Sequence, residues 1–354
     1  MDVNLVYTLL VQDGIDVDPE TVRVEARDDR WAVRLSGNHM AWVPMNAQGA
    51  MRLLTERRVL ELLSERCTFL TPKILHVAET GWDLRAVVPG KCDPWGLFMR
   101  LQTDRTLAKQ IGRSLGEILV QQHSRIHMED TVGWLQRKLS WPAPWDTIES
   151  HLPDVVDDID LLRDAGRLIK TLRLDEDSNT TDSVLVHGDL GLHNIAFDPE
   201  TSKVEGVFDY ETAAWADRHY DFRYLMFDRQ EDDLLNSALE VYEGDLGIQL
   251  DRQRIRRLNA ACAVGFLAHR RGTPPEAHSC GRTLAEDVGW VRHALARLTL
   301  LWHIIIGGFC QGLVTVRASS RRRPCEEIED RVSDCRHGRL RRWSLDPFFF
   351  VPLL

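Results

Sequence analysis

The sequence predicts an α+β protein in which a small antiparallel sheet precedes a larger and mostly helical part. Two observations predict this order. Between residues 21 and 45, apolar and polar residues alternate, which is the period of strands with one buried face. Between residues 104 and 127, apolar residues recur every three or four positions instead, which is the period of a helix packed on a core.

Residues 1–90 contain the signals of the small sheet. A short helix is expected within residues 1–20, ending near Gly14. Residues 36–38, Ser-Gly-Asn, favour a hairpin turn between two strands. The other elements expected here are a helix at 50–65 and strands at 71–77 and 84–88.

The rest of the chain predicts mainly helices, expected at 104–127, 159–172, 222–227, 237–242 and 255–267, with a loop at 174–182. Residues 298–316 are a long apolar run. We interpret it as a buried terminal helix without stable membrane insertion, because His303, Gln311 and two glycines interrupt it. From residue 317 the chain is rich in arginine and has no clear period. A disordered or loosely docked basic tail is therefore expected at 317–354.

The composition sets limits on the partners of this chain. The 354 residues, 44% hydrophobic and 28% charged, can form one two-lobed domain or two small domains with a sizeable core. The formal net charge of −10 makes nucleic acid an unexpected partner for the main body and suits cationic ligands. The oligomeric state is left open.

The cysteines and the first residues bear on the compartment. The seven cysteines are scattered and form no CxxC pair, so neither a zinc site nor a disulfide framework is expected. The first residues, MDVNLVYTLLVQDG, have no basic segment ahead of the apolar ones, which argues against a signal peptide. We therefore expect a cytoplasmic protein, since thiols stay reduced there.

Short strands expected at 184–186, 195–197 and 204–208 place three polar side chains at strand ends. Asp189 and Asn194 lie in HGDLGLHN between the first two strands, and Asp209 lies in FDYE after the third. Phosphoryl transfer needs one carboxylate to accept or orient the hydroxyl proton, and an amide oxygen and a second carboxylate to hold Mg²⁺. These residues fit the roles in that order. The alternative is a surface turn with no chemistry.

HGDLGLHN followed by FDYE resembles the aminoglycoside phosphotransferase and choline kinase family, whose members are relatives of the protein kinases. The resemblance implies a two-lobed, protein-kinase-like fold, with a nucleotide-binding N-lobe at 1–90 and a catalytic, substrate-binding C-lobe at 91–316. It also implies transfer of the γ-phosphate of ATP or GTP, with Mg²⁺, to a hydroxyl group of a small molecule. Asp189 would be the catalytic residue, and Asn194 and Asp209 would be the metal ligands.

The resemblance continues through residues 214–225, AWADRHYDFRYL. Asp221 matches the family's second aspartate in this segment, which braces the catalytic loop, and Asp217 matches the aspartate before it. Together with His187, these residues would position the loop without taking part in the chemistry.

The N-lobe departs from the family pattern at one position. Kinases pair a strand-borne lysine, which contacts the phosphates, with a glutamate on a helix. Glu56 matches the glutamate, but the strand expected to carry the lysine reads AWVPMN and has no basic residue. Arg34, on the preceding strand, is the nearest cation in the sequence that could replace it. Alternatively, Arg34 is a solvated strand residue and Glu56 a surface acid paired with Arg52.

The resemblance also suggests where the two substrates bind. Adenine would lie against Val87 and Val88, ahead of residues 89–90, which match the family's hinge and could equally be a simple turn. The cationic acceptor, for example an aminoglycoside, would bind an acidic group that could equally be a solvated helix N-terminus. This group consists of Asp228, Glu231, Asp232 and Asp233.

Two other functions remain open on the sequence alone. The missing lysine favours a non-catalytic, pseudokinase-like protein that binds nucleotide without turning it over. A metal-dependent phosphoesterase could use the same acids, although such enzymes usually have more clustered histidines than this sequence. Turnover of ATP, and hydrolysis without nucleotide, would distinguish the three functions.

Overall fold

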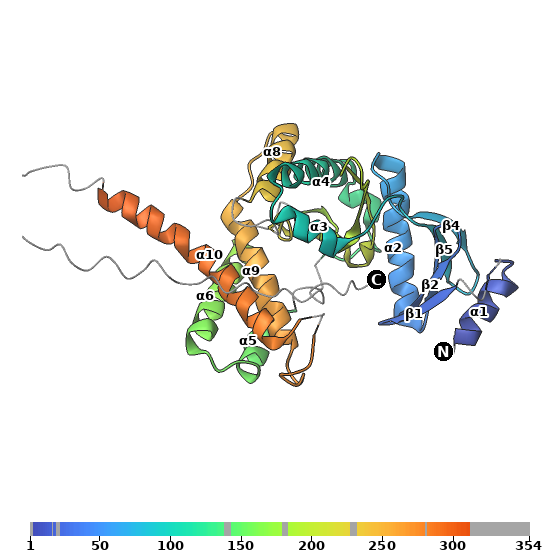
Figure 1. Ribbon diagram of the computed structural model, residues 1–354, viewed down its shortest axis with the longest axis horizontal. Helices are drawn as coiled ribbons and strands as arrows, with labels where there is room; N and C mark the ends of the chain where they lie inside the picture. Colours follow the sequence, from blue (N-terminus) through green and yellow to red (C-terminus); the bar gives the residue numbers. More distant parts are fainter. Residues whose placement is uncertain are drawn as a thin grey trace, which may run out of the picture.

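The computed structural model describes residues 3–15, 17–18, 22–137, 143–178, 183–226, 232–279 and 282–311. Its first part is a five-stranded antiparallel sheet with the order β1-β2-β3-β5-β4 (Figure 1). The strands are β1 (Arg23–Arg27), β2 (Arg30–Leu35), β3 (His39–Pro44), β4 (Lys73–Val77) and β5 (Asp83–Ala86). Helix α1 (Val3–Gln12) precedes the sheet, and α2 (Ala47–Arg66) lies between β3 and β4.

Alternation along the strands gives the sheet two different faces. Val33, Ala41 and Leu84 are buried in one apolar cluster with Val6 and Leu10 of α1. Side chains of the intervening residues point to the opposite face, because successive residues of a strand alternate. That face meets α2, where the ion pairs of Glu56 described below are made.

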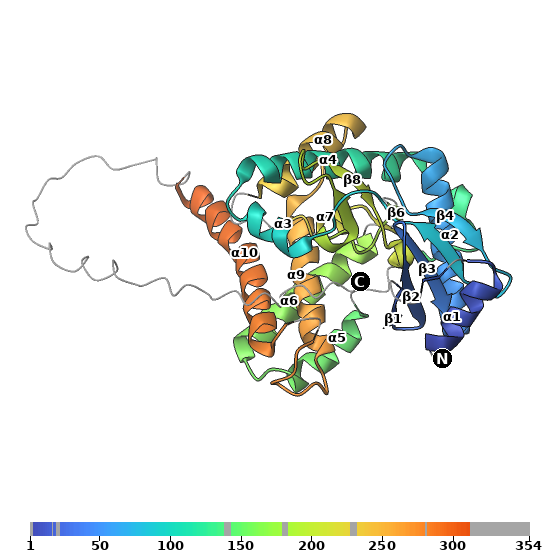
Figure 2. The same ribbon diagram turned by 45° about the vertical axis from the view of Figure 1, so that its right-hand side comes forward.

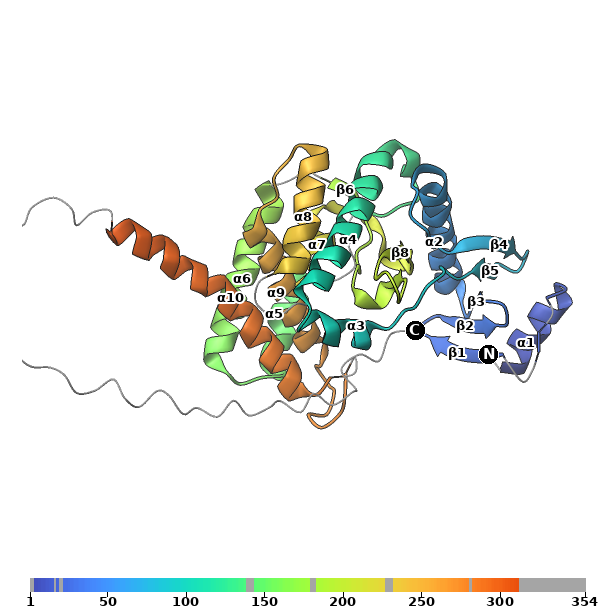
Figure 3. The same cartoon turned by 45° about the horizontal axis from the view of Figure 1, so that its top comes forward.

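A short linker joins the sheet to the helical part, as Figure 3 shows between β5 and α3 (Pro94–Leu101). Its backbone is tied to β7: Lys91 N–H donates to the Phe197 carbonyl at 2.8 Å, and Phe197 N–H donates to the Lys91 carbonyl at 3.0 Å. Gly90 precedes this pair with φ +113°, and a Cβ there would lie 2.9 Å from the Phe197 oxygen. Only glycine meets both conditions without strain.

The second part is mainly helical and contains two small sheets. Its helices are α4 (Arg105–Arg125), α5 (Trp145–His151), α6 (Ile159–Ser178), α7 (His219–Phe222), α8 (Asp233–Leu246), α9 (Arg252–His269) and α10 (Leu284–Gln311). Strand β6 (Ser183–Val186) pairs with β9 (Ala214–Asp217), and β7 (Ile195–Phe197) pairs with β8 (Val204–Val207). Short 3-10 helices are η1 (Met128–Thr131), η2 (Leu152–Asp154), η3 (Leu192–Asn194) and η4 (Tyr210–Thr212).

Two apolar cores organise the helical part. The larger is built around α4 and α8, which lie side by side in Figures 1 and 2, and it reaches into β7 and β8. The smaller joins α5, α6, α9 and the first half of α10. Within the described ranges, none of the helices combines the length and the apolarity that a membrane crossing requires.

The predicted fold class is confirmed: an antiparallel sheet is followed by a helical part. The expected loop at 174–182 is wrong in its first half, because α6 continues to Ser178. Asp175, which looked like a loop residue, is held by Arg254 at 3.3 Å and Arg257 at 3.0 Å from α9. The helix expected at 222–227 is also wrong, since α7 ends at Phe222.

Other boundaries differ because apolar runs mark only the buried part of a helix. Helix α8 is longer than the expected 237–242, α10 begins well before residue 298, and α3 was not expected at all. The basic tail at 317–354 lies outside the described residues.

The close approach of α4 to α8 generates a stability prediction. A Cβ on Gly112 would lie 2.3 Å from the Leu234 carbonyl oxygen, whereas one on Gly166 of α6 would meet nothing within 4 Å. We expect Gly112→Ala to lower the free energy of unfolding by about 1–3 kcal/mol through overpacking. Gly166→Ala should leave it unchanged or raise it by up to about 1 kcal/mol, because alanine favours helix. Thermal unfolding of both variants measures this, and equal effects would contradict it.

Candidate active site

The loop between β6 and β7 places Asp189 at the end of a buried strand. Its carboxylate is one-third exposed, at 33%, and accepts a hydrogen bond from His193 Nε2 at 3.1 Å. Asn194 is buried and donates from Nδ2 to the Asp189 carbonyl at 2.9 Å. The turn from Asp189 to Asn194 is therefore closed by its own side chains, with one carboxylate left open to a ligand.

Asp221 holds this loop through its backbone. Its two carboxylate oxygens accept hydrogen bonds from the N–H groups of His187 at 2.9 Å and of Gly188 at 3.0 Å. Gln122 and His123 of α4 contact the same carboxylate at 3.0 and 3.1 Å. Burial would raise the pKa of Asp221, but the hydrogen bond and charge of His123 and the contacts of His187 lower it.

His187 links the loop to the turn that carries Asp209. Its Nε2 donates to the Phe208 carbonyl at 3.0 Å, and its Nδ1 accepts from the Asp189 N–H at 3.1 Å. Burial lowers the pKa of His187, so the ring is neutral, as an acceptor at Nδ1 requires. The structure thus brings His187, Asp189 and Asp221 together.

Asp217, the other residue expected to support the loop, contacts α7 and α9 instead of the loop backbone. It accepts hydrogen bonds from His219 N and Nδ1, at 3.0 and 2.5 Å, and pairs with Arg254 of α9. Burial would raise the pKa of Asp217, but His219 and Arg254 lower it to about 2. Asp217 therefore anchors the start of α7, and α7 carries Asp221.

Sequence reasoning missed two residues at this loop. Arg223 is fully buried and donates to the Gly188 carbonyl at 2.5 Å and to Cys262 Sγ at 3.0 Å. The available signal was an arginine inside the apolar run FRYLM. The other is His193, which acts on Asp189. Burial would raise the pKa of Asp189, but the hydrogen bond and charge of His193, and then the charge of Arg223, lower it.

Asp209 has an unusual backbone and an unusual pKa. It adopts φ 67° and ψ 59°, the left-handed region that non-glycine residues enter at a cost. Burial and the negative charges of Glu56 and Asp189 raise its pKa to about 7, although Arg30 and His193 oppose the shift. Strain and unfavourable charge at one residue are typical of a position selected for binding and not for stability.

The oxygen donors near the loop fit a magnesium ion. Because Asn194 uses its amide nitrogen toward Asp189, its amide oxygen is directed elsewhere and can act as a ligand. Asp209 supplies a carboxylate that a cation would relieve of repulsion. In the part of the chain that the structure describes, no three His, Cys, Asp or Glu residues form a metal-binding group. Two protein oxygens suit Mg²⁺, which keeps waters and phosphate oxygens as its other ligands.

The structure shows which cations surround Glu56 and where Arg34 lies. Glu56 is 2% exposed and lies between Arg85 at 2.9 Å and Arg30 at 3.5 Å, while Arg52 pairs with Asp29 at 3.3 Å. It is therefore not a surface acid paired with Arg52. Arg34 is exposed on β2 and lies about 13 Å along the strand from Arg30. The cations that contact Glu56 are Arg30 and Arg85, and Arg34 does not contact it.

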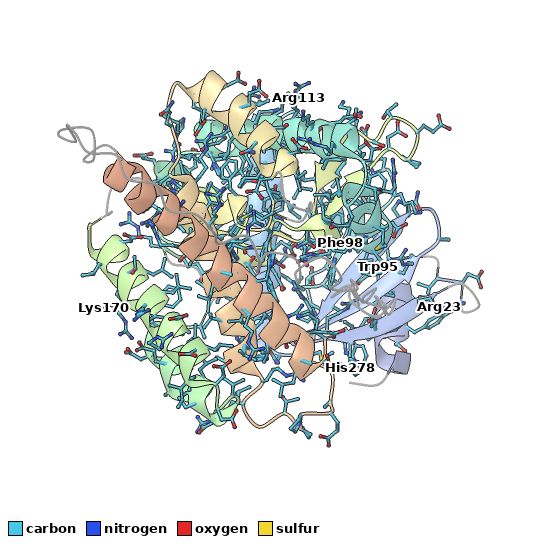
Figure 4. All side chains as sticks on the ribbon, turned by 60° about the vertical axis from the view of Figure 1, so that its left-hand side comes forward. Arg23, Trp95, Phe98, Arg113, Lys170 and His278 are labelled. Atoms are coloured by element: carbon cyan, nitrogen blue, oxygen red, sulfur yellow. The ribbon has the colours of Figure 1, made fainter. Side chains whose placement is uncertain are left out.

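The residues expected to contact adenine lie on the linker. Val87 is exposed, but its N–H donates to the Asn38 carbonyl at 2.9 Å and is not free for a base. Val88 is buried. Farther along, Trp95 and Phe98 of α3, both labelled in Figure 4, stack with ring centroids 5.7 Å apart.

The acidic group expected at the acceptor site is only partly described, since Asp228 and Glu231 lie outside the described residues. Asp232 is 4% exposed and pairs with Arg256 at 3.2 Å and with Arg297. Asp233 pairs with Arg105 at 2.5 Å. Both carboxylates are thus already neutralised by arginines, so this placement does not favour the expected attraction of a cationic acceptor.

Comparisons with known proteins place this chain in context. Residues 10–276 match the model of the phosphotransferase enzyme family. Over 95 residues the chain is 34% identical to streptomycin 3''-kinase of Streptomyces griseus, a match that covers 26% of this chain and 35% of the relative. The chain therefore spans about a third of the length of the curated relative that it matches.

Solved structures share the fold. A GDP complex of an aminoglycoside 2'-phosphotransferase-IIIa mutant has a TM-score of 0.61 at 17% identity, covering 87% of this chain and 99% of that one. A ternary complex of APH(2")-IIa with streptomycin and ATP has 0.59 at 13%, covering 83% and 96%. The macrolide 2'-phosphotransferase of Brachybacterium faecium has 0.57 at 18%, covering 83% and 98%. At these identities the likeness shows a common fold.

The raised pKa of Asp209 predicts a pH-dependent stability. Its folded pKa of about 7 exceeds the unfolded value, so the carboxyl binds its proton more tightly when folded and its ionisation opposes folding. This penalty is absent below the unfolded pKa and grows until the pH passes about 7. Without metal, Asp209→Asn should therefore be more stable than the wild type at pH 8, by about 1–3 kcal/mol.

At pH 4 the two proteins should have nearly equal stability. Asparagine also tolerates the left-handed backbone, so the comparison isolates the charge. Thermal unfolding across pH 4–8 measures the effect. A stability difference that is constant over this range would show that Asp209 does not titrate as described.

Proposed function

This chain belongs to the phosphotransferase enzyme family, and from that premise we propose that it transfers the γ-phosphoryl group of ATP or GTP to a hydroxyl group of a small molecule. The observation that carries the proposal is the arrangement of three residues. Asn194 donates a hydrogen bond to the Asp189 carbonyl, and the charges of Asp189 and Glu56 raise the pKa of the nearby Asp209. Phosphoryl transfer needs one open carboxylate and two metal ligands, and this arrangement supports the assignment of these roles to Asp189, Asn194 and Asp209.

In the proposed mechanism, Asp189 orients the acceptor hydroxyl and takes its proton late in the transfer. Its lowered pKa keeps it ionised near neutral pH, and His193 fixes one of its oxygens so that the other faces the hydroxyl. Asn194 and Asp209 would hold Mg²⁺, which neutralises phosphate charge when bound. His187, Asp221 and Arg223 hold the loop still, which matters because alignment accounts for much of the rate.

We further propose that residues 1–90 bind the nucleotide and that residues 91–316 supply the catalytic loop and the acceptor site. An aminoglycoside-like cationic amino alcohol is the favoured acceptor, on the net charge of −10 and on the partial match to a streptomycin kinase. Because Asp232 and Asp233 are paired with arginines, other acids would have to attract it.

A second candidate function is supported by one observation. Strand β3 carries Trp42 and no lysine, so the chain could bind nucleotide without transferring phosphate. Measurement of phosphate transfer beside nucleotide binding distinguishes the two functions.

The mechanism predicts the effect of removing one charge. Asp189→Asn should lower kcat by about 10²–10⁴-fold, because the proton acceptor and the alignment of the hydroxyl are lost together. Affinity for the magnesium nucleotide and the Tm should change little. Glu200→Gln, at an exposed carboxylate on the β7–β8 turn, is the matched control. Steady-state kinetics with an acceptor found by screening would test this, and equal kcat values would remove Asp189 from the mechanism.

The acceptor class predicts a salt dependence. If the acceptor is cationic, its capture by an acidic protein is partly electrostatic and is screened as ionic strength rises. We expect KM for the acceptor to rise several-fold between low and about 0.5 M salt, while KM for the nucleotide changes less. Screening aminoglycosides and neutral polyols for ATP or GTP consumption provides the acceptor. A neutral or anionic acceptor would contradict this part of the proposal.

A further inference from the structure

Trp42 occupies the middle of the sheet face that meets α2, and arginines from both neighbouring strands flank it. Trp42 pairs with Ala32 of β2 on one side and with Asp83 of β5 on the other. The guanidinium carbons of Arg30 and Arg85 lie 4.9 and 5.9 Å from its ring centroid. Cations favour the face of an indole ring. The positive charge missing from β3 is therefore present on the strands to either side.

Arg85 is fully engaged by carboxylates. Its Nε and one terminal nitrogen bind the two oxygens of Asp83 at 2.6 and 3.1 Å, and its other terminal nitrogen binds Glu56 at 2.9 Å. It is 2% exposed. A guanidinium whose three nitrogens each contact a carboxylate, and which is almost closed to solvent, can orient Glu56 but is poorly placed to bind a ligand.

Arg30 is nearly as buried, at 5% exposed, but it is paired less completely. Its contact with Glu56 is long, at 3.5 Å, and its Nε has no hydrogen-bond partner among the described residues. Its second acidic partner is Glu211, which lies two residues after Asp209. The charge of Arg30 also acts on Asp209 itself. Arg30 thus reaches from the sheet to the turn that would hold the metal.

Glu211 is the partner that can leave. Its side chain is 23% exposed, whereas that of Glu56 is 3% exposed and also accepts a hydrogen bond from the Tyr210 backbone. A carboxylate and a phosphate group present similar pairs of oxygens to a guanidinium, so one can replace the other.

We propose that Arg30 is the phosphate-contacting cation of this protein and that Glu211 occupies it when no nucleotide is bound. Binding of a nucleoside triphosphate then exchanges the Glu211 carboxylate for phosphate oxygens, while Glu56 keeps the guanidinium in place. This rests on the proposed function, because it assumes that a triphosphate binds between the sheet and Asp209. Glu211 is a competitor for the same donors, and its presence lowers the apparent affinity for triphosphate.

The test compares triphosphate with nucleoside binding by calorimetry, with MgATP and adenosine or MgGTP and guanosine as probes. Arg30→Met should weaken triphosphate binding about tenfold to a hundredfold and leave nucleoside binding nearly unchanged, since a charge-assisted contact to phosphate is lost. Arg30→Lys should restore part of the loss. Arg23→Met, at an exposed arginine of the same sheet (labelled in Figure 4), is the matched control.

Glu211→Gln should change the affinity for triphosphate in the direction opposite to Arg30→Met, which a merely structural ion pair would not do. With the competitor neutralised, affinity for triphosphate should rise about threefold to tenfold, and in the Arg30→Met background the same change should have no effect. Unchanged or weaker binding in Glu211→Gln would overturn the proposal, as would equal loss of triphosphate and nucleoside affinity in Arg30→Met.

The outcomes also separate this proposal from the one on which it rests. A wild-type protein that binds and consumes the triphosphate, with Arg30 variants that bind it equally well, would refute the role of Arg30 alone. A folded wild-type protein that binds neither triphosphate nor nucleoside would refute the proposed function, and the role of Arg30 with it.

Discussion

The buried carboxylate of Asp221 is the interaction on which the rest of the site depends. It is 1% exposed and contacts two backbone N–H groups of the loop and two side chains of α4. Each such donor left unpaired in a buried position costs about 1–3 kcal/mol. The loop between β6 and β7, α4 and the end of β6 therefore adopt one arrangement together. The backbone position of Asp189 is set by these contacts to the neighbouring backbone and not by contacts of its own carboxylate.

A second group of buried charges connects the sheet to the helical part. Glu56 is paired with two arginines from the sheet and accepts a backbone hydrogen bond from Tyr210, next to Asp209. Burial would raise the pKa of Glu56, but Arg85 and Arg30 lower it, so it stays ionised. Ion pairs of this kind contribute less to stability than to a specific geometry, because desolvation offsets most of their attraction.

Features encoded in neighbouring residues could be predicted from the sequence, whereas contacts between distant residues could not. Asp189, Asn194 and Asp209 stand at fixed spacings within one segment, and their strands follow from apolar runs. The arginine that contacts Glu56 most closely could not be found in this way. Arg85 lies 29 positions later, on β5, whereas proximity in the chain favoured Arg34. The arginine inside the apolar run FRYLM marks Arg223 as unusual but does not reveal its contact with the loop, and a histidine in a loop, such as His193, has no distinctive pattern.

The backbone pair between Lys91 and Phe197 restricts how the two parts of the molecule can move. Val87 is anchored to Asn38 on one side and Lys91 to β7 on the other, which leaves only residues 88–90 without those anchors. Proline has a nearly fixed φ, so few torsions remain between the anchors. A linker with so few free torsions would favour a small rocking of one part against the other over a wide separation. Any opening between the two parts would then depend mainly on the motion of side chains and little on the backbone of residues 88–90.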